Sequence, residues 1–429
     1  MKKIRIGVLG AYRGTSMINY CKSSEDAQVV AICDKCEATL AEQKTHIDDP
    51  SVAFYLTFDE FIKHDMDAVV LANYANEHAP FAIRCLNAGM HVFSEVLPVQ
   101  TMKEAVELIE AVERSGKVYA YGENYCYIPS CYKMRTLYRE GLIGEFEYGE
   151  GEYVHNCESI WPSITYGESE HWRNNKYATF YCTHSIGPLI HITGLRPVSV
   201  IGLEGTNIAR GLRTGQKGGS FGIEMITLEN GGIIKSIHGG LYNNSIWYSV
   251  YGSKGRMETG REDGEGIHML YTHSDEFSGQ YRPDDRRDYD MNAEKLDKTV
   301  PFGHGGSDYY SMYNFIEKLK GNAGADTIDV YEALDMFLPG MFAYRSVLNG
   351  GMTMAIPNLR NPEERNKWRN DTFCTDKKVG GEMYVPPFSQ GELDIPESVY
   401  AQMKALWERE LESKSGYMNA AFTQGAAEK

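Results

Sequence analysis

Two hydrophobic patterns divide the chain. Up to about residue 120, short runs rich in β-branched residues alternate with segments of helical periodicity. These runs predict strands at 4–8, 29–32, 68–71, 92–93 and 118–120, and the periodicity predicts an amphipathic helix at 103–115. Strands that alternate with helices are typical of an α/β fold with a doubly wound parallel sheet. We therefore predict that residues 1–124 form such a domain.

Longer segments with period-two alternation follow residue 125. They predict strands at 145–153, 198–204, 223–228, 233–238 and 245–251, and helical patterns occur at 185–192 and 308–319. Strands with one apolar and one polar side form a mostly antiparallel sheet with one solvated face and one face covered by helices. Residues 125–429 are thus expected to form a second, α+β domain built on a large open sheet, with a loose C-terminal end.

The composition narrows the range of partners. The chain has 43 Lys and Arg against 59 Asp and Glu, a net charge of -16, which argues against nucleic acid and against an anionic membrane surface. Its nine cysteines have no repeating spacing, so we expect reduced thiols rather than a disulfide framework. We see no apolar run of the length of a signal sequence or a transmembrane helix, and expect a cytoplasmic protein.

A glycine-bearing turn follows the first predicted strand, where Gly10, Tyr12, Arg13 and Gly14 occupy the place of a dinucleotide-binding turn. In the GxGxxG pattern of Rossmann domains, the first glycine makes the tight turn, the second admits the pyrophosphate and the third lets the helix pack on the strand. Gly10 matches the first position, Tyr12 and Thr15 occupy the second and third, and Gly14 is displaced by one. The turn alone fits a cofactor site and a plain strand–turn–helix connection equally well.

Asp34 ends the second predicted strand, about twenty residues after the glycines. An acid at this place accepts hydrogen bonds from the ribose of NAD and repels the 2′-phosphate of NADP. NAD is therefore the expected cofactor, and the adjacent Lys35 keeps NADP open as an alternative. The other interpretation of Asp34 is a turn residue or a helix N-cap.

Asp34 and the runs 69–80 and 89–95 resemble the Gfo/Idh/MocA oxidoreductase family. In that family a catalytic lysine follows the glutamate that matches Glu95, whereas this chain has Val96 at that position. Valine cannot accept a proton, so other residues must take the proton of the alcohol. The resemblance implies an NAD site to which the following side chains contribute: Asn73, Asn76, His78, Glu95 and Asn124.

The second half resembles one branch of this family, glycoside hydrolase family 109 and its relatives. Five blocks carry the resemblance in the same order along the chain: 122–127, 144–155, 171–173, 181–188 and 303–309. Because these enzymes hydrolyse glycosides with a tightly held NAD, the resemblance implies a sugar or glycoside as the small-molecule substrate. It also implies a homo-oligomer.

In the reaction that the resemblance implies, the sugar is transiently oxidised at C3, loses its C2 proton, expels the aglycone from C1, adds water and is reduced again. By resemblance, Tyr153 is the C2 base. Tyr181 and His184 form a Tyr-x-x-His element, and their spacing predicts that both side chains face the same side of a helical turn. His184, whose ordinary pKa lies near neutrality, is the expected acceptor of the alcohol proton. Glu123 follows the last strand of the first sheet, where it is expected to bind a sugar hydroxyl or to orient Tyr153 or His184.

Both proton-transfer residues have an ordinary interpretation as well. Tyr153 could be a half-buried strand aromatic, and His184 a hydrogen-bonded core histidine. A phenol with a pKa near 10 also needs a nearby cation to ionise at neutral pH, for which His155, Arg173 and the nicotinamide are the candidates.

Substrate contacts are expected from five further residues: His155, Trp172, Arg173, His304 and Asp308. Trp172 suits stacking on a sugar face, with a buried tryptophan as the alternative, and Asp308 alternatively belongs to the first turn of a helix. His184 and His191 are seven apart but have no acid partner nearby, so no metal is expected.

Three functions follow from these patterns. The first is an NAD-dependent enzyme that cleaves a glycoside by transient oxidation, and the second is a net sugar C3 dehydrogenase that releases a keto sugar. The third is a non-catalytic NAD-binding protein that kept the fold after losing the lysine. The presence of Tyr153, Tyr181 and His184 argues against the third.

Overall fold

The structure is a computed structural model that describes residues 2–261, 267–272, 286–290, 302 and 304–413. The chain folds into two compact units, each assembled from three stretches. The Rossmann unit comprises residues 1–127, 302–334 and 359–371, and the sheet unit comprises residues 128–301, 335–358 and 372–429. The first division lies close to the expected one at 124/125. The two later stretches that return to the Rossmann unit are not apparent from hydrophobic periodicity.

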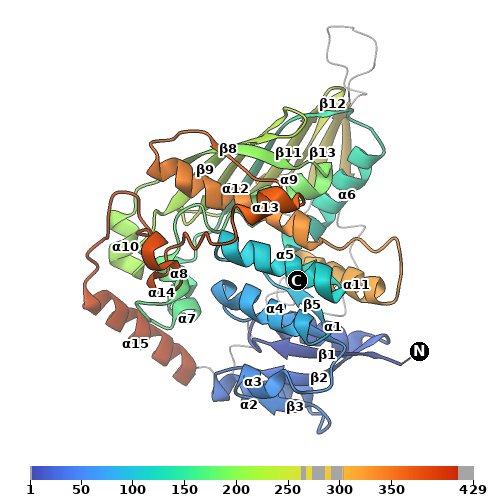
Figure 1. The fold of residues 1–429 in the computed structure, drawn as a ribbon, viewed down its shortest axis with the longest axis vertical. Coiled ribbons are helices and arrows are strands. Elements are labelled where there is room, and N and C mark those ends of the chain that lie inside the picture. The colour runs from blue at the N-terminus through green and yellow to red at the C-terminus, as the bar shows by residue number, and fades with distance from the viewer. Residues whose placement is uncertain (1, 262–266, 273–285, 291–301, 303, 414–429) are drawn as a thin grey trace. The chain divides into compact units, whose positions relative to one another are not determined.

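A six-stranded parallel sheet forms the centre of the Rossmann unit, in the order β3-β2-β1-β4-β5-β6 (Figure 1). Its strands are β1 (Ile4–Leu9), β2 (Ala27–Cys33), β3 (Ala53–Tyr55), β4 (Ala68–Leu71), β5 (His91–Ser94) and β6 (Tyr119–Tyr121). All four residues of β4 are buried, as expected for a central strand covered on both faces. The predicted doubly wound parallel sheet is confirmed.

Helices follow the strands of the Rossmann unit in the α/β order. They include α1 (Thr15–Ser23), α2 (Glu37–Ile47), α3 (Phe58–Phe61), α4 (His78–Asn87) and α5 (Met102–Ser115). The side chain of Thr101 accepts a hydrogen bond from Glu104 N at the start of α5, and Gly116 ends the helix in the left-handed conformation with φ +62°. These caps account for the predicted helix at 103–115.

The Rossmann core is completed by a helix from far along the chain, α11 (Ser307–Leu319). Met312, Phe315 and Ile316 of α11 belong to the same hydrophobic cluster as the β1 and β4 side chains. The Phe315 ring centroid lies 5.6 Å from that of Phe93 in β5. This packing places the start of α11, including Asp308, in the Rossmann unit.

The sheet unit is built on a nine-stranded sheet in the order β14-β13-β12-β11-β7-β10-β9-β8-β15. The strands are β7 (Phe146–Val154), β8 (Pro197–Glu204), β9 (Phe221–Leu228), β10 (Ile233–Gly239), β11 (Ser245–Gly252), β12 (Gly255–Thr259), β13 (Ile267–Thr272), β14 (Arg286–Asp290) and β15 (Met354–Ala355). Among the described pairs only β7 and β10 are parallel. The predicted mostly antiparallel sheet is confirmed, and each predicted strand agrees with an observed one to within two residues at each end.

Helices cover one face of this sheet and surround its edge. They include α6 (Pro129–Arg139), α7 (Trp161–Thr165), α8 (Trp172–Asn175), α9 (Thr183–Thr193), α10 (Ile208–Thr214), most of α12 (Val330–Leu348) and α15 (Glu397–Ser413). Helix α9 packs on β7, β10 and β11. In the part of the chain that the structure describes, no helix has the length and apolar character needed to cross a bilayer.

Glycines set how closely the helices lie on the sheet. A Cβ atom at Gly151 in β7 would lie 1.9 Å from the carbonyl oxygen of Ser185 in α9, and one at Gly202 in β8 would lie 2.2 Å from that of Ala343 in α12. Any larger residue would push the helix away from the strand. Gly151 therefore determines the position of the first turn of α9, which carries His184.

Candidate active site

Gly10 makes the turn after β1 with φ +91°, a conformation that glycine adopts without strain. A Cβ atom here would lie 2.4 Å from both the carbonyl carbon and the oxygen of Ala72, which follows β4. The turn and the end of β4 are thus in backbone contact. Glycine is required here, as the first position of the dinucleotide-binding pattern demands.

Gly14 occupies the space of the third glycine of that pattern, although it is displaced by one residue in sequence. A Cβ atom at Gly14 would lie 2.5 Å from Val8 Cγ1 and 2.6 Å from Gly10 O. Gly14 therefore lets the start of α1 pack closely on β1. Tyr12 stands at the second position, and 47% of its surface is exposed.

Asp34 ties the ends of β1 and β2 together. Its Oδ2 accepts a hydrogen bond from Ala11 N at 2.8 Å, and its Oδ1 accepts one from Cys36 N at 2.9 Å. These are the bonds of a turn residue, one of the two interpretations of Asp34, and its role as a ribose ligand stays a prediction. The neighbouring Lys35 Nζ lies 4.0 Å over the ring of Tyr74.

Three buried amide oxygens near the carboxyl ends of β4 and β6 have no hydrogen-bond partner among the described residues: Oδ1 of Asn73, Asn76 and Asn124. An unsatisfied buried acceptor costs about 1–3 kcal/mol. Open α/β sheets bind their ligands at this edge, and NAD offers hydroxyl and amide donors there. The residues present therefore fit the expected cofactor.

His78 links two segments of this edge. Its Nδ1 lies 2.9 Å from Leu97 O and its Nε2 lies 3.3 Å from Asn73 O. Burial lowers the pKa of His78 to about 4, so the ring is neutral at physiological pH. With both ring nitrogens at backbone carbonyls, His78 positions Asn73 and the segment after Glu95, and direct contact with the cofactor stays a prediction.

Arg13 lies between two buried carboxylates of the Rossmann unit. Its guanidinium is 2.6 Å from Glu95 Oε1, and it donates to both oxygens of Asp308 at 3.0 and 3.1 Å. Asp308 also accepts from Asn124 Nδ2 at 3.0 Å, and His304 Nδ1 lies 3.3 Å away. The Asp308 carboxylate thus organises three side chains, those of Arg13, Asn124 and His304, and its expected contact with a substrate hydroxyl stays a prediction.

The pKa values of the two carboxylates around Arg13 are shifted in opposite directions. Arg13 and His304 hold the pKa of Asp308 well below its usual range against the opposing effect of burial. Burial raises the pKa of Glu95 to about 7, and the Asp308 charge adds to that rise while Arg13 opposes it. One guanidinium therefore keeps Asp308 ionised, and Glu95 exchanges its proton near neutral pH.

Two further expected residues of the Rossmann unit flank this cluster. Glu123 is fully buried at the end of β6, and its Oε1 accepts a hydrogen bond from Tyr125 N at 3.2 Å. Val96, at the lysine position of the resembled family, is 8% exposed. The Rossmann unit thus contributes the buried acid Glu123. At the position of the family lysine it has the apolar side chain of Val96.

In the sheet unit, Tyr153 and His184 lie side by side. Tyr153 is near the end of β7 and His184 is in the first turn of α9, with ring centroids 4.5 Å apart and an interplanar angle of 62°. The hydroxyl of Tyr153 lies 3.0 Å from Nδ1 of His155. Tyr248 OH donates to His184 O at 2.5 Å, which fixes this helix turn to β11. The fold therefore brings a phenol and two imidazoles together.

Tyr181 joins the same group of rings. Its centroid lies 5.2 Å from that of His184 and 6.4 Å from that of Tyr153. Tyr181 precedes α9, whose N-cap is Cys182, so the contact arises from the turn before the helix and not from i, i+3 spacing within it. The expected proximity of the two side chains is observed, but the expected helical geometry is not.

Trp172 and Arg173 lie against Tyr181. The Trp172 and Tyr181 rings are stacked at 6.3 Å with an interplanar angle of 22°. The Arg173 guanidinium lies 4.4 Å over the Trp172 ring and 5.7 Å over the Tyr181 ring. Trp172 is half-buried, so it combines both interpretations: it packs against its neighbours and keeps part of its surface open.

The Tyr153 cluster, as we call it, consists of Tyr153, His155, Cys157, Trp172, Arg173, Lys176, Tyr181 and His184. Two of these residues, Lys176 and Cys157, were not identified from the sequence. Lys176 Nζ lies 5.0 Å over the Tyr181 ring. A hydrogen bond to Cys157 raises the pKa of His155, and His155, Arg173 and Lys176 together lower the pKa of Cys157 against the effect of burial. Both residues lie outside the five blocks that carry the family resemblance, so no motif pointed to them.

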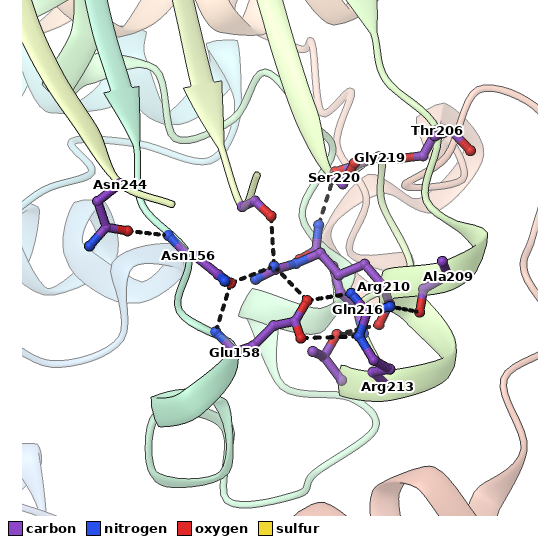
Figure 2. Close-up of polar contacts among 12 residues, drawn as sticks. Asn156, Glu158, Thr206, Ala209, Arg210, Arg213, Gln216, Gly219, Ser220 and Asn244 are labelled. Atoms are coloured by element: carbon purple, nitrogen blue, oxygen red, sulfur yellow. Dashed lines mark hydrogen bonds and ion pairs between the residues drawn. The ribbon is translucent and has the colours of Figure 1, made fainter. Parts of the chain in front are cut away.

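A network of polar contacts holds the segment that carries His155 and Cys157 (Figure 2). Arg210 Nη1 donates to Asn156 Oδ1 at 3.1 Å, to Glu158 Oε1 at 3.2 Å and to Gly240 O at 2.7 Å. Arg213 donates to both oxygens of the same glutamate at 2.6 and 3.1 Å. The segment after β7 is therefore fixed to α10, and the two arginines of that helix share the carboxylate of Glu158.

Comparison with known proteins matches two separate parts of the chain to different family models. Residues 4–123 match the oxidoreductase family with an NAD-binding Rossmann fold, Gfo/Idh/MocA. Residues 242–369 match the C-terminal domain of glycosyl hydrolase 109. The chain combines a Gfo/Idh/MocA NAD-binding domain with a glycosyl hydrolase 109 C-terminal domain. The resemblance inferred from the sequence motifs and the expectation of an NAD-binding domain are confirmed.

Bacterial relatives match the chain at low identity. A glycosyl hydrolase family 109 protein of Saccharopolyspora erythraea is 24% identical over 399 residues, 85% of this chain and 84% of its own. An alpha-N-acetylgalactosaminidase of Shewanella oneidensis is 29% identical over 201 residues, 44% of each chain. The match to a family 109 protein of Shewanella sp. strain ANA-3 also spans 44% of that relative. Substrates of these proteins are therefore not transferred to this chain.

Solved structures share the fold. An oxidoreductase from Agrobacterium radiobacter in complex with NAD+, L-tartaric acid and magnesium has a TM-score of 0.68 at 13% identity, covering 82% of this chain and 98% of that one. Levoglucosan dehydrogenase in complex with NADH and levoglucosan has a TM-score of 0.68 at 17% identity, with 83% and 100% covered. At these identities the likeness establishes the architecture alone.

Proposed function

We propose that the protein is an NAD-dependent enzyme that cleaves a glycoside by transient oxidation of the sugar. The observation that carries this proposal is the contact of Tyr153 with His184 and His155, because it places proton-transfer groups together in a chain that has Val96 in place of the family lysine. Net sugar oxidation needs one proton acceptor. Elimination at a ketone-activated sugar needs a second acceptor for the C2 proton.

The residues of the chain divide the proton transfers as follows. His184 accepts the proton of the C3 hydroxyl, since imidazole can both accept and return a proton near neutral pH. Tyr153 takes the C2 proton, and its own proton passes to His155 through the 3.0 Å hydrogen bond. The raised pKa of His155 makes it a better acceptor for that proton.

The bonds balance as a hydrolysis. Loss of the C2 proton from the 3-keto sugar expels the aglycone from C1, and water then adds at C1 while C2 regains a proton. Bound NAD would supply the hydride acceptor that the C3 oxidation needs, and its reduced form the donor for the final reduction. On the side of the Rossmann unit, Asn73, Asn76, Glu95 and Asn124 are the residues proposed to hold it.

Turnover in deuterated water tests the proposal. A panel of aryl glycosides is incubated with the protein, and the product is analysed for label at C2 while NADH is followed by absorbance. We expect deuterium at C2 and no NADH in proportion to product, because the C2 proton is exchanged and the hydride is returned. Stoichiometric NADH without C2 label would support the net sugar C3 dehydrogenase, and no turnover of any glycoside would support the non-catalytic protein.

A tyrosine variant assigns the C2 base. Tyr153→Phe should lower aglycone release and C2 exchange about 10²- to 10⁴-fold, the range of general acid–base catalysis, and should still allow NAD reduction in a single turnover. Tyr148→Phe is the matched control, since Tyr148 lies on the same strand and its ring contacts that of Tyr251 instead, with centroids 5.9 Å apart. Equal loss in both variants would remove Tyr153 from the proposed role.

A further inference from the structure

The aromatic rings of the Tyr153 cluster carry two cations. Arg173 lies 4.4 Å over Trp172, and Lys176 Nζ lies 5.0 Å over Tyr181. Because the two rings are stacked, both charges are held beside one aromatic platform. This platform adjoins Tyr153 and His184, where the proposed function places the sugar.

No carboxylate neutralises these two cations. Among the residues that the structure describes, neither Arg173 nor Lys176 makes an ion pair, and the contacts of their charged ends are with rings. Nearby cations of the sheet unit, by contrast, have carboxylate partners. Arg210 and Arg213 share Glu158, and Lys217 Nζ lies 3.1 Å from Glu170 Oε1. Arg173 and Lys176 therefore differ from these three cations in being held beside aromatic rings instead of a carboxylate.

The ionisable groups around the platform respond to this charge. Burial, followed by the charge of Arg173, lowers the pKa of Lys176 to about 7, with Arg210 acting in the same direction and Cys157 against it. The pKa of Cys157 is lowered by His155, Arg173 and Lys176. A thiol is drawn toward its anionic form where the potential is positive, and a buried ammonium loses its proton when it has no counter-ion.

We propose that the sugar recognised beside Tyr153 and His184 is acidic, and that Arg173 and Lys176 bind its oxyanion, a carboxylate, phosphate or sulfate. The proposal rests on the proposed function insofar as that function places a sugar at this cluster. Arginine offers paired donors that match the oxygens of such a group, and lysine adds a compact charge. The aromatic platform supports the sugar ring beside it.

Binding should then take up a proton. The bound anion faces Arg173 and Lys176 directly, with Cys157, His155 and Arg210 as the other charged or titratable neighbours on the surrounding elements. An oxyanion favours the ammonium form of Lys176, so its pKa rises in the complex. Between about pH 7 and 9 the affinity for the acidic sugar should fall as the free protein loses the Lys176 proton, while affinity for a neutral sugar should not follow this profile.

Calorimetric titration of the full chain with NAD present tests the proposal. The probes are methyl glucuronide and methyl galacturonide, their neutral counterparts methyl glucoside and methyl galactoside, and glucose 6-phosphate and glucose 6-sulfate. We expect at least one acidic sugar to bind 10-fold or more tightly than its neutral counterpart, and the apparent enthalpy to depend on the buffer through the proton taken up. The relative affinities of the three anions identify the oxyanion.

Variants separate recognition from folding. Lys176→Met and Arg173→Met should each lower the affinity for the acidic sugar about 10-fold and that for the neutral sugar much less, so that the preference for the acidic sugar falls, whereas Arg173→Lys should restore part of the loss. Lys217→Met, which removes a lysine paired with Glu170, should leave the preference intact. Thermal unfolding identifies any variant that fails to fold, for which the milder Lys176→Gln replaces methionine.

Two results would overturn the proposal: no acidic probe binds more tightly than its neutral counterpart, or the preference survives the loss of both cations. The proposed function fails separately. An acidic sugar that binds through Arg173 and Lys176 but gives no C2 label on turnover contradicts the hydrolytic cycle alone. Cleavage of neutral glycosides with C2 label and no acid preference contradicts the acidic substrate alone.

Discussion

Arg13 and Asp308 are 295 positions apart in the sequence, yet their side chains form a two-pronged ion pair of 3.0 and 3.1 Å in the Rossmann unit. The pair joins the turn after β1 to the first turn of α11, and Glu95 shares the same guanidinium. Since Asp308 is buried, its charge depends on Arg13 for compensation. This ion pair links the proposed cofactor turn to the helix that completes the core.

Removal of the Asp308 charge should destabilise the protein. Asp308→Asn leaves Arg13 with one incompletely ionised partner, and breaking a buried pair in this way costs about 3 kcal/mol of unfolding free energy. Urea denaturation followed by circular dichroism measures the loss. The control is Lys320→Met, which breaks the exposed ion pair of Lys320 with Asp26 after the same helix and should change the midpoint far less. Similar shifts in the two variants would contradict a special role for Asp308.

Glu95 should make stability depend on pH in the neutral range. Its pKa rises from 4.5 to about 7 on folding, so the folded state holds the proton more tightly than the unfolded state. The contribution is therefore present below pH 4.5 and is lost as the pH rises to about 7 and above, for a total of about 3 kcal/mol. Asp308, whose folded pKa is depressed, loses its stabilising charge only in acid and does not offset this trend.

Glu95→Gln should flatten that profile. Urea denaturation between pH 5 and 8 measures the unfolding free energy of both proteins. The value for the variant should rise relative to that of the wild type as the pH rises, because glutamine does not titrate. A constant difference between the two proteins over this range would show that Glu95 stays ionised beside Arg13.

Asp34 provides the test of the cofactor contact. We expect the purified protein to release NAD on denaturation, and Asp34→Ala to weaken NAD binding by about 1–3 kcal/mol, because charged hydrogen bonds are lost. Titration calorimetry of the NAD-free protein measures the change. Asp49→Ala, which removes another turn acid bonded to Ser51, is the control. Unchanged affinity in Asp34→Ala would assign Asp34 to the turn alone.

Gly151 should matter for activity more than for the sheet itself. In Gly151→Ala the new methyl group meets Ser185 O, so the first turn of α9 must shift and carry His184 away from Tyr153. We expect at least a 10-fold loss of kcat together with lower thermal stability. Gly324→Ala, whose Cβ would lie 3.4 Å from Asn322 Oδ1, should leave both values near those of the wild type. Full activity in Gly151→Ala would mean that the helix position does not control the site.

The sequence predicted five of the six strands of the first sheet and five of the nine described strands of the second, because each of these repeats a local pattern of period two or a continuous apolar run. The short β3 and the strands β12 to β15 were not predicted. It did not predict that α11 returns to the Rossmann unit, since the contacts of Phe315 with Phe93 depend on chain topology that periodicity does not encode. For the same reason, the sequence did not predict the ion pair of Arg13 with Asp308. Arg13 was expected at the cofactor site and Asp308 at the substrate site. Nothing in the sequence indicated that their side chains contact each other.

The candidate site was predicted in part. Motif resemblance identified Tyr153, Tyr181 and His184, and their rings do lie together. Lys176 and Cys157 belong to no motif, and their importance comes from the charges around them in the fold. A lysine that lacks an acid partner can be recognised only after all its neighbours are known.

The return of α11 to the first sheet also has a consequence for protein synthesis. Met312, Phe315 and Ile316 belong to the hydrophobic cluster of the Rossmann unit. They have not yet been made when residue 127, the last residue of the first stretch of that unit, leaves the ribosome. At translation rates of about 5–20 residues per second, the missing helix arrives roughly 10–40 s later. During this interval the nascent sheet exposes apolar side chains to chaperones and to neighbouring chains, so the domain that is synthesised first is completed only after much of the second has been made.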